Sequence, residues 1–249
     1  MATTSEFPAG ATALVTGASS GIGEAIAARL ADGDCRVVCA GRRLDALEAL
    51  CERLGSSAYP LALDVTEPES VESITSRLPG DWREIDILVN NAGHDEGGRC
   101  RFDEGTADQW ARIIETNVTG LIRTTHALIP GMIARDRGHV VNIGSIAGLS
   151  PYATGTIYSG SKHAVHGFSE SLRLDFAGTG IRVTEIMPGV VRTNFALNRW
   201  GDKTRADAFY DDFGTCLDPD DVARTVLFTL GQPPHVVISQ LVVVPSAQR

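Results

Sequence analysis

Tyr158 and Lys162 lie four residues apart in a stretch with helical character, so both side chains are expected on one face of a helix. A free tyrosine has a pKa of about 10, which is too high for efficient proton transfer at neutral pH. A neighbouring ammonium favours the phenolate and so lowers that pKa. The pair could therefore give a proton to a carbonyl oxygen in a reduction, or take one from an alcohol in an oxidation. The same spacing also occurs by chance on exposed helices, so it gains weight only beside other parts of a site.

Ser145 follows an apolar run, 139–144, that is typical of a buried strand. Ligands of open α/β sheets bind at the carboxyl ends of the strands, which is where this hydroxyl would lie. We therefore expect Ser145 to hold the same substrate oxygen as Tyr158 and to stabilise the charge that develops on it.

A glycine-rich turn follows the first apolar run of the chain, in the sequence Thr16-Gly17-Ala18-Ser19-Ser20-Gly21-Ile22-Gly23. Its three glycines let the backbone approach closely and expose amide groups towards a diphosphate at the start of a helix. The spacing has one more residue between the first and last glycine than the common dinucleotide fingerprint. The turn predicts a dinucleotide site, and tight packing of a strand against a helix is the alternative.

The end of the second apolar run indicates which dinucleotide is bound. Many dinucleotide sites place an acid there for the ribose 2′-hydroxyl, but here Gly41 is followed by Arg42 and Arg43. A guanidinium binds a phosphate through two hydrogen bonds, whereas a carboxylate would repel it. NADP(H) is therefore favoured over NAD(H). In the alternative, both arginines open a solvated helix and pair with Asp45 or Glu48.

Short runs rich in β-branched residues alternate with longer amphipathic stretches, which predicts a single-domain α/β Rossmann fold with helices on both faces of a doubly wound, mostly parallel, seven-stranded sheet. The expected strands are 12–16, 36–40, 59–63, 85–90, 139–144, 182–187 and 236–243. The expected helices are 23–32, 44–54, 68–78, 107–134, 156–177 and 219–230. Residues 1–249 are taken as one domain, with a substrate lid inserted at about 194–215.

Two helix starts carry recognisable caps. Thr66 with Glu69 three residues on resembles a capping box for the helix at 68–78. Asp218 followed by Pro219 is an N-cap with a proline at the first helical position.

The composition of the chain disfavours several classes of binding partner and indicates a cellular compartment. The chain has 249 residues, a net charge of −9 and a pI near 5.1, which disfavours nucleic acid and anionic membranes as partners. Five cysteines without a C-x-x-C pair or a Cys/His cluster predict reduced thiols and no metal site. The first residues lack the charged and apolar segments of a secretory signal, so a cytoplasmic protein is expected.

Together these features resemble the classical short-chain dehydrogenase/reductase family over almost the whole chain. The matching motifs are Thr16-Gly17 through Gly23, Asp64-Val65, Asn90 through Gly93, Asn117 with Gly120, Gly144-Ser145, Tyr158 with Lys162, and Pro188-Gly189 with Thr193. Within the family the chain looks most similar to NADP-dependent 3-hydroxy acid and serine dehydrogenases. It departs from that subgroup at 94–99, which is polar and charged where the subgroup tends to be apolar.

The resemblance assigns four catalytic roles. It implies that Tyr158 is the proton donor or acceptor and that Ser145 orients the substrate oxygen. It further implies that Lys162 binds the nicotinamide ribose and tunes Tyr158, while Asn117 supports a water path to that lysine.

The resemblance also assigns the cofactor contacts. Asp64 and Val65 would border the adenine, Asn91 the adjoining ribose, and the segment 188–193 the nicotinamide end. The full expected set is Gly17, Ser19, Ser20, Gly21, Ile22, Gly23, Arg42, Arg43, Asp64, Val65, Asn91, Ala92, Gly93, Tyr158, Lys162, Pro188, Gly189, Val191 and Thr193.

The expected activity is transfer of a hydride between NADP(H) and the alcohol or carbonyl of a small polar metabolite, with a 3-hydroxy acid or related short hydroxy compound as the leading substrate. A broad-specificity carbonyl reductase and a 3-oxoacyl-carrier-protein reductase are alternatives, and a protein that senses NADP(H) without turnover is the non-enzymatic one. By the resemblance, helices 107–134 and 156–177 pair with copies of themselves, which implies a homo-oligomer, a dimer of dimers.

Three assignments stay open at this point. His94 either points into the substrate cleft or faces solvent. Arg192 either binds an anionic substrate or lies at the surface. The aromatic-rich segment 194–215 is either a lid or a pair of short helices packed on the core.

Overall fold

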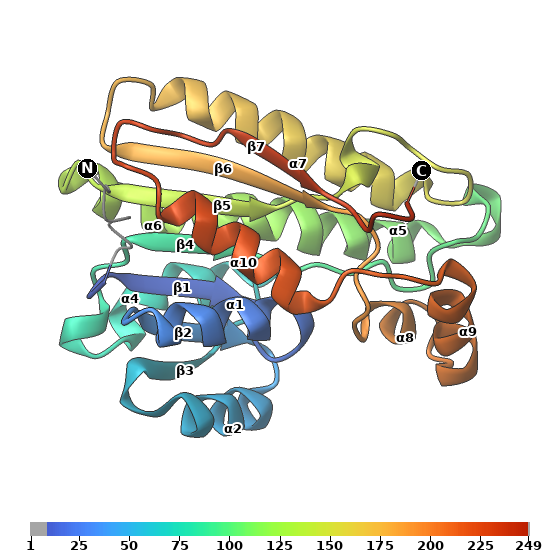
Figure 1. The fold of residues 1–249 in the computed structure, drawn as a ribbon, viewed down its shortest axis with the longest axis horizontal. Helices are drawn as coiled ribbons and strands as arrows, with labels where there is room; N and C mark the ends of the chain where they lie inside the picture. Colours follow the sequence, from blue (N-terminus) through green and yellow to red (C-terminus); the bar gives the residue numbers. More distant parts are fainter. Residues whose placement is uncertain (1–8, 249) are drawn as a thin grey trace.

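The sheet has seven strands, all parallel, in the order β3-β2-β1-β4-β5-β6-β7 (Figure 1). This computed structural model describes residues 9–248. The strands are β1 Thr12–Thr16, β2 Arg36–Gly41, β3 Ala58–Ala62, β4 Ile87–Asn90, β5 Gly138–Ile143, β6 Ile181–Pro188 and β7 Gln240–Val243. The predicted fold class is confirmed, and the sheet proves entirely rather than mostly parallel. Its carboxyl ends therefore lie along one edge.

Helices cover both faces of the sheet, as the alternation of strands and helices requires. On one face, α1 Gly21–Asp32, α2 Leu44–Leu54 and α10 Pro219–Leu230 pack against the strands. On the other, α3 Pro68–Glu72, α4 Ile74–Arg77 and α6 Leu121–Ala134 enclose a second apolar core, and α7 Thr156–Asp175 lies beside β6 (Figure 1). Central strands such as β1 and β4 are therefore buried on both sides, which explains their uninterrupted apolar sequences.

The stretch predicted as one helix over 107–134 has three parts. It begins as α5 Ala107–Ile114, widens into a π-helical turn over Glu115–Gly120, and continues as α6. Gly120 packs so closely that a Cβ there would lie 2.6 Å from Cγ2 of Val65. A π turn interrupts the regular spacing of side chains and is common at functional sites. The apolar period continues across this turn, so the sequence pattern did not reveal it.

The helix predicted at 68–78 is also divided, at Ser73, and its predicted cap is wrong. The N-cap is Glu67, and Pro68 takes the first helical position. The Thr66 hydroxyl instead donates to Oδ1 of Asp64 at 2.7 Å, where it helps to fix the turn after β3. The second predicted cap is confirmed, because Asp218 and Asp221 form a reciprocal capping box at the start of α10.

The inserted segment forms two short helices, α8 Phe195–Trp200 and α9 Lys203–Phe213, at one end of the sheet (Figure 1). They share a small apolar cluster of their own, built on Ala196, Ala206 and Tyr210. The hydroxyl of Tyr210 donates to the carbonyl of Thr193 at 3.0 Å, which attaches α9 to the chain that leaves β6. The segment is thus a helix pair with a separate core.

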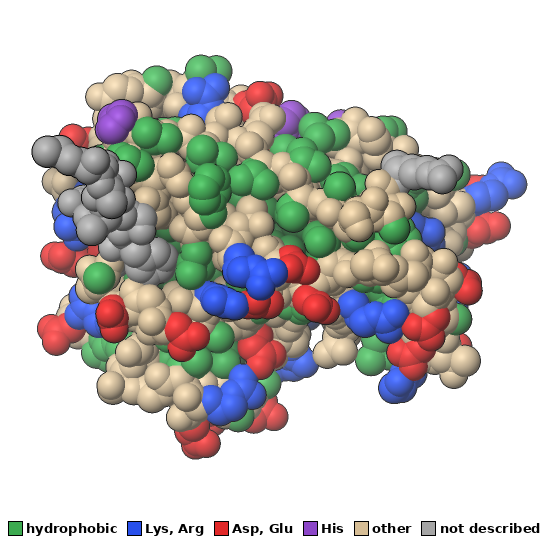
Figure 2. All heavy atoms as spheres, in the orientation of Figure 1, with side chains coloured by type: hydrophobic (Ala, Val, Ile, Leu, Met, Phe, Trp, Pro, Cys, Tyr) green, Lys and Arg blue, Asp and Glu red, His purple; other side chains and the backbone are tan. Residues whose placement is uncertain are grey.

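Charged side chains of both signs are interspersed over α1, α10 and α9 on the face shown in Figure 2, and apolar side chains gather around β7. The edge strand and its flank expose Val242 and Val244, and α10 exposes Phe228. Within residues 9–248, no helix is both long enough and apolar enough to cross a bilayer.

Candidate active site

A cavity of about 1090 Å³ opens at the carboxyl edge of the sheet and extends from the glycine-rich turn to α8 and α9. Of the predicted site residues, Gly23 and Asn117 alone do not line it. The predicted residues that do are Gly17, Ser19, Ser20, Gly21, Ile22, Arg42, Arg43, Asp64, Val65, Asn91, Ala92, Gly93, Ser145, Tyr158, Lys162, Pro188, Gly189, Val191 and Thr193. Residues from six loops and two helices thus meet on one surface because the strands are parallel.

The three glycines of the turn have different structural roles. Gly17 and Gly21 have φ of +68° and +60°, in the left-handed region that favours glycine. Gly23 lies inside α1, where a Cβ would be 2.4 Å from the carbonyl oxygen of Gly17. It therefore permits packing of the helix against the turn and does not face a ligand. The turn stays open in front of the first amide groups of α1, as a diphosphate site requires.

Arg43 lies across the glycine-rich turn. Its Nη2 donates to Oγ of Ser19 at 2.9 Å and to Oγ of Ser20 at 2.8 Å. In the described part of the chain, neither Arg42 nor Arg43 forms an ion pair with Asp45 or Glu48, so the alternative pairing is absent there. Both guanidiniums are exposed in the cavity wall, and no acid stands at Gly41. This end of the cavity therefore suits a phosphate ester.

Ser145, Tyr158 and Lys162 meet where β5 ends against α7. Ser145 lines the cavity close enough to Tyr158 to lower its pKa, and the Tyr158 ring packs edge-on against Phe195 with centroids 5.6 Å apart. Nζ of Lys162 lies 5.8 Å from the centroid of the Tyr158 ring and donates to the carbonyl of Ile143 at 2.8 Å. The three catalytic groups predicted from the sequence are therefore neighbours in the wall of the cavity.

Lys162 does not lower the pKa of Tyr158 in this structure. Burial of its hydroxyl raises the pKa of Tyr158 above its ordinary value, and the nearby Ser145 offsets only part of that rise. The Lys162 ammonium is directed at Ile143, not at the phenol. Ser145 is thus the one partner among these groups that favours the phenolate here.

Burial also lowers the pKa of Lys162 to about 8, although Glu185 opposes this effect. Glu185 is fully buried and accepts a hydrogen bond from Nδ1 of His166 at 2.8 Å. A charged Lys162 thus opposes folding below pH 8, because its ordinary pKa is 10.5. The cost is relieved as the pH rises from 8 towards 10.5.

Lys162→Met should therefore raise the free energy of unfolding at pH 7 by about 2 kcal/mol, the net of the desolvation cost and the lost hydrogen bond to Ile143. Urea titrations at pH 7 and pH 10 measure this, and the gain should disappear at the higher pH. Lys203→Met is the matched control, since Lys203 is exposed and pairs with Asp207. A Lys162→Met protein that is less stable than the parent at pH 7 would contradict the argument.

Asn117 does not reach the cavity. Its amide lies in the π turn, accepts from the main-chain N–H of His94 at 2.9 Å, and donates to the carbonyl of His94 and to Oγ of Ser161. It thereby fastens the loop after β4 to α7. Asn91 is similarly engaged, because its Nδ2 donates to the carbonyl of Thr16 at 2.9 Å. Both side chains hold the walls of the site in place.

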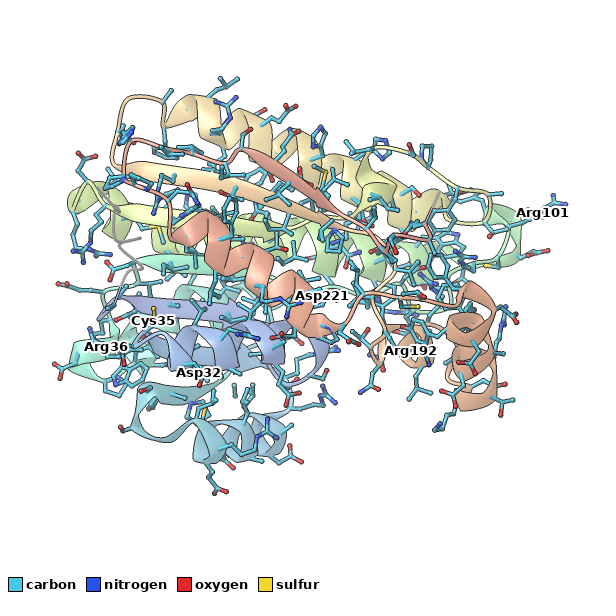
Figure 3. All side chains as sticks on the ribbon, in the orientation of Figure 1. Asp32, Cys35, Arg36, Arg101, Arg192 and Asp221 are labelled. Carbon is cyan, nitrogen blue, oxygen red and sulfur yellow. The ribbon has the colours of Figure 1, made fainter. Side chains whose placement is uncertain are left out.

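The sequence left open whether His94 and Arg192 contact the substrate, and the structure places the two residues differently. His94 lines the cavity and its Nε2 lies 3.1 Å from Oγ1 of Thr116, so it is not a solvent-facing side chain. Burial lowers the pKa of His94. Arg192 lies at the base of the α8–α9 pair (Figure 3), where it forms a 2.9 Å ion pair with Asp211 and does not line the cavity. A role for Arg192 in binding substrate is therefore not supported.

Sequence reasoning missed a buried ion pair beside the site. Asp95 and Arg199 are 3% and 6% exposed, and Oδ2 of Asp95 lies 2.8 Å from Nε of Arg199. The N–H of Gly97 also donates to the carbonyl of Arg199 at 2.7 Å. The loop after β4 is thus joined to α8. The polar character of 94–99 was the one signal in the sequence, but it did not identify a partner 104 residues away.

Comparison with known proteins gives a consistent set of relatives. The family model described as short chain dehydrogenase matches residues 11–203. An NADP-dependent 3-hydroxy acid dehydrogenase from Salmonella typhi is 41% identical over 237 residues, 94% of this chain and 95% of that protein. A serine 3-dehydrogenase from Agrobacterium fabrum is 40% identical, over 95% of this chain and 94% of that protein. The closed form of a serine dehydrogenase complexed with NADP⁺ superposes with a TM-score of 0.93 at 40% identity, covering 96% of each chain.

Proposed function

This chain belongs to the short-chain dehydrogenase family, and from that premise we propose that it transfers a hydride between NADP(H) and the alcohol or carbonyl carbon of a small polar metabolite, a 3-hydroxy acid being the leading substrate. It is an NADP-dependent dehydrogenase acting on CH–OH groups. The observation that carries the proposal is that Ser145 and Tyr158 line the same cavity as the glycine-rich turn and the two arginines, with Ser145 close enough to lower the pKa of Tyr158.

The residues present fit the dinucleotide. Gly17 packs so closely on the loop after β4 that a Cβ there would lie 2.9 Å from Nδ2 of Asn91, so the bare backbone of the turn forms the cavity wall that a diphosphate would meet. Arg42 and Arg43 offer guanidiniums to a 2′-phosphate, and Asp64 and Val65 line the neighbouring wall. Bound NADP(H) supplies or accepts the hydride.

We assign the proton to Tyr158. In a reduction its phenol donates to the forming alkoxide, and in an oxidation its phenolate accepts the proton of the alcohol. The Ser145 hydroxyl holds the same oxygen. The raised pKa of Tyr158 favours the protonated form, which suits reduction; oxidation requires its proton to leave first. Nζ of Lys162 lies 5.8 Å from the centroid of the phenol ring; the ammonium would stabilise the phenolate once it forms and would hold the nicotinamide ribose of the bound cofactor.

The α8–α9 pair is proposed to act as a lid over the substrate end. Asn194, Phe195, Asn198, Arg199 and Phe209 from this segment line the cavity. Its apolar cluster is separate from the main core, so the pair could move as a unit. Loops that close over a reacting centre exclude water and complete the site.

We also propose that the chain forms a homo-oligomer. The segment 107–134 exposes Ile114, Ile122 and Ile133, and α7 exposes Leu174, so both helices carry apolar side chains that a second copy of the chain could cover.

The experiment that tests the activity is a panel of short hydroxy acids, their esters and simple secondary alcohols, each assayed with NADP⁺ and NAD⁺. Highest kcat/KM on a 3-hydroxy acid with NADP⁺ would support the proposal. A preference for neutral ketones in the reverse direction would favour a broad-specificity carbonyl reductase instead.

Replacement of both arginines tests the phosphate assignment. Arg42→Ala/Arg43→Ala should lower kcat/KM for NADP⁺ by about 10- to 100-fold, because charge-assisted hydrogen bonds to a phosphate are lost. The value for NAD⁺ should change by less than about 3-fold, since NAD⁺ lacks that phosphate. Arg53→Ala is the control, because Arg53 is exposed and pairs with Glu24 away from the cavity. Equal losses with both dinucleotides would refute the assignment.

A further inference from the structure

Arg99 is a cation in the wall of the cavity, placed between two aromatic rings. Its Cζ lies 4.9 Å from the centroid of the Tyr152 ring and 5.1 Å from that of Phe209. Tyr152 belongs to the segment that precedes α7, and Phe209 belongs to α9. The guanidinium therefore connects the loop after β4, the approach to Tyr158 and the proposed lid.

The charge of Arg99 has no acidic partner among the described residues, in contrast to the arginines around it. Arg199 pairs with Asp95, Arg192 with Asp211, and Arg101 with Asp103. Asp95 lies four residues before Arg99, but its carboxylate is buried in an ion pair with Arg199. Glu96 also lines the cavity and forms no ion pair with Arg99 in this part of the chain.

The backbone at Arg99 is strained for an arginine. Its φ is +59°, in the region that glycine and asparagine adopt more readily. The preceding turn is fixed by hydrogen bonds from Gly97 to the carbonyl of Arg199 and from Gly98 to the carbonyl of Asp95. Strain of this kind persists where surrounding structure imposes it, and it is concentrated at ligand sites.

We propose that Arg99 binds the carboxylate of the substrate and thereby selects short hydroxy acids over neutral alcohols. The two rings lie within about 5 Å of its Cζ and attract the cation to this part of the wall, and a planar guanidinium can form two in-plane hydrogen bonds to a carboxylate. Tyr152 and Tyr158 line the same cavity, so a ligand that meets Arg99 over the Tyr152 ring lies in the same space as the reacting phenol. The inference rests on the proposed function and specifies its substrate class.

The test compares 3-hydroxybutanoate with its methyl ester, using NADP⁺ and three variants. Arg99→Asn and Arg99→Gly remove the guanidinium at a position whose φ suits the new residues better, so loss of fold is not expected. Each should raise KM for the acid by about 10- to 100-fold and change KM for the ester by less than about 3-fold. Arg99→Lys should fall between them and the parent, because it keeps the charge without the planar fork. Values of kcat for the acid at saturation should change little.

Arg101→Asn is the matched control, since Arg101 projects outward at the end of the molecule (Figure 3), pairs with Asp103 and does not line the cavity. It should leave both KM values unchanged. Equal changes for acid and ester in Arg99→Asn, or no change for either, would overturn the proposal.

Failure of the proposed function would look different. If the parent protein turned over neither compound, calorimetry would measure binding of 3-hydroxybutanoate to the NADP⁺-loaded parent and to Arg99→Asn. Binding by the parent that weakens at least 10-fold in the variant would support the anion site alone. Absent or equal binding would overturn it.

Discussion

Tyr158→Phe is expected to lower kcat by about 10³-fold on the preferred substrate, the largest effect of any single change considered, because it removes the only proton donor proposed for the reacting oxygen. The phenylalanine ring can keep the 5.6 Å edge contact with Phe195, so the shape of the cavity should survive. Loss of the hydroxyl also leaves Ser145 as the only hydroxyl assigned to that oxygen. Steady-state kinetics in both directions measure the loss.

Tyr152→Phe provides the matched control for this experiment. Tyr152 lines the same cavity and its ring lies beside Arg99, but Ser145 is not among the groups that act on its hydroxyl. Its replacement should change kcat by less than about 10-fold. Fluorescence titration should show that both variants bind NADPH as the parent does. Full turnover by Tyr158→Phe would remove this residue from the mechanism.

Asp95→Leu is expected to lower the free energy of unfolding by about 3–5 kcal/mol, because the buried Arg199 guanidinium then has no compensating charge. Arg199 is 6% exposed, so water does not replace the lost carboxylate. The double variant Asp95→Leu/Arg199→Met should recover much of the loss, since neither charge is then buried unpaired. Urea unfolding of the two single variants and the double variant gives the coupling energy.

The pH dependence of Arg199→Met provides an independent check on the same pair. Burial raises the pKa of Asp95 even with Arg199 present, and removal of the arginine should raise it further. The folded state then binds more protons than the unfolded state, so stability falls as the pH rises through the window between the two pKa values. Arg199→Met should thus lose more stability, relative to the parent, at pH 8 than at pH 5. Equal losses at both pH values would argue against a buried carboxylate.

Asp103→Leu is the control for both experiments, because it breaks an exposed ion pair with Arg101. It should lower the free energy of unfolding by less than about 1 kcal/mol at either pH.

Local patterns predicted most of the framework. The glycine-rich turn, the apolar runs and the Tyr158–Lys162 spacing depend on neighbours a few residues away, and each forms the expected type of element, although the last strand is shorter than predicted, 240–243 in place of 236–243. Parallel strands then bring their carboxyl ends together, so Ser145 and the glycine-rich turn share a cavity as expected.

Other features depend on contacts that sequence spacing does not encode. The pKa of Tyr158 is set by burial, which only the packed fold supplies. The partner of Asp95 lies on α8, far along the chain, and the partner of Arg192 is a carboxylate on α9. The π turn that carries Asn117 leaves the apolar period of 107–134 intact, so a continuous helix was the simpler reading.

Because the seven strands are parallel, the cavity lies at their carboxyl ends, and their amino ends form the opposite side of the molecule. None of the residues that line the cavity comes from the connections that enter β2, β3, β5, β6 or β7 at their amino ends. The turn Gly55–Ser57 is one such connection, and a Cβ at Gly55 would meet nothing within 4 Å. An affinity tag or a fluorescent label carried there would be separated from the cavity by the length of the strands, so the enzyme could be immobilised through this end without obstructing the entrance to its active site.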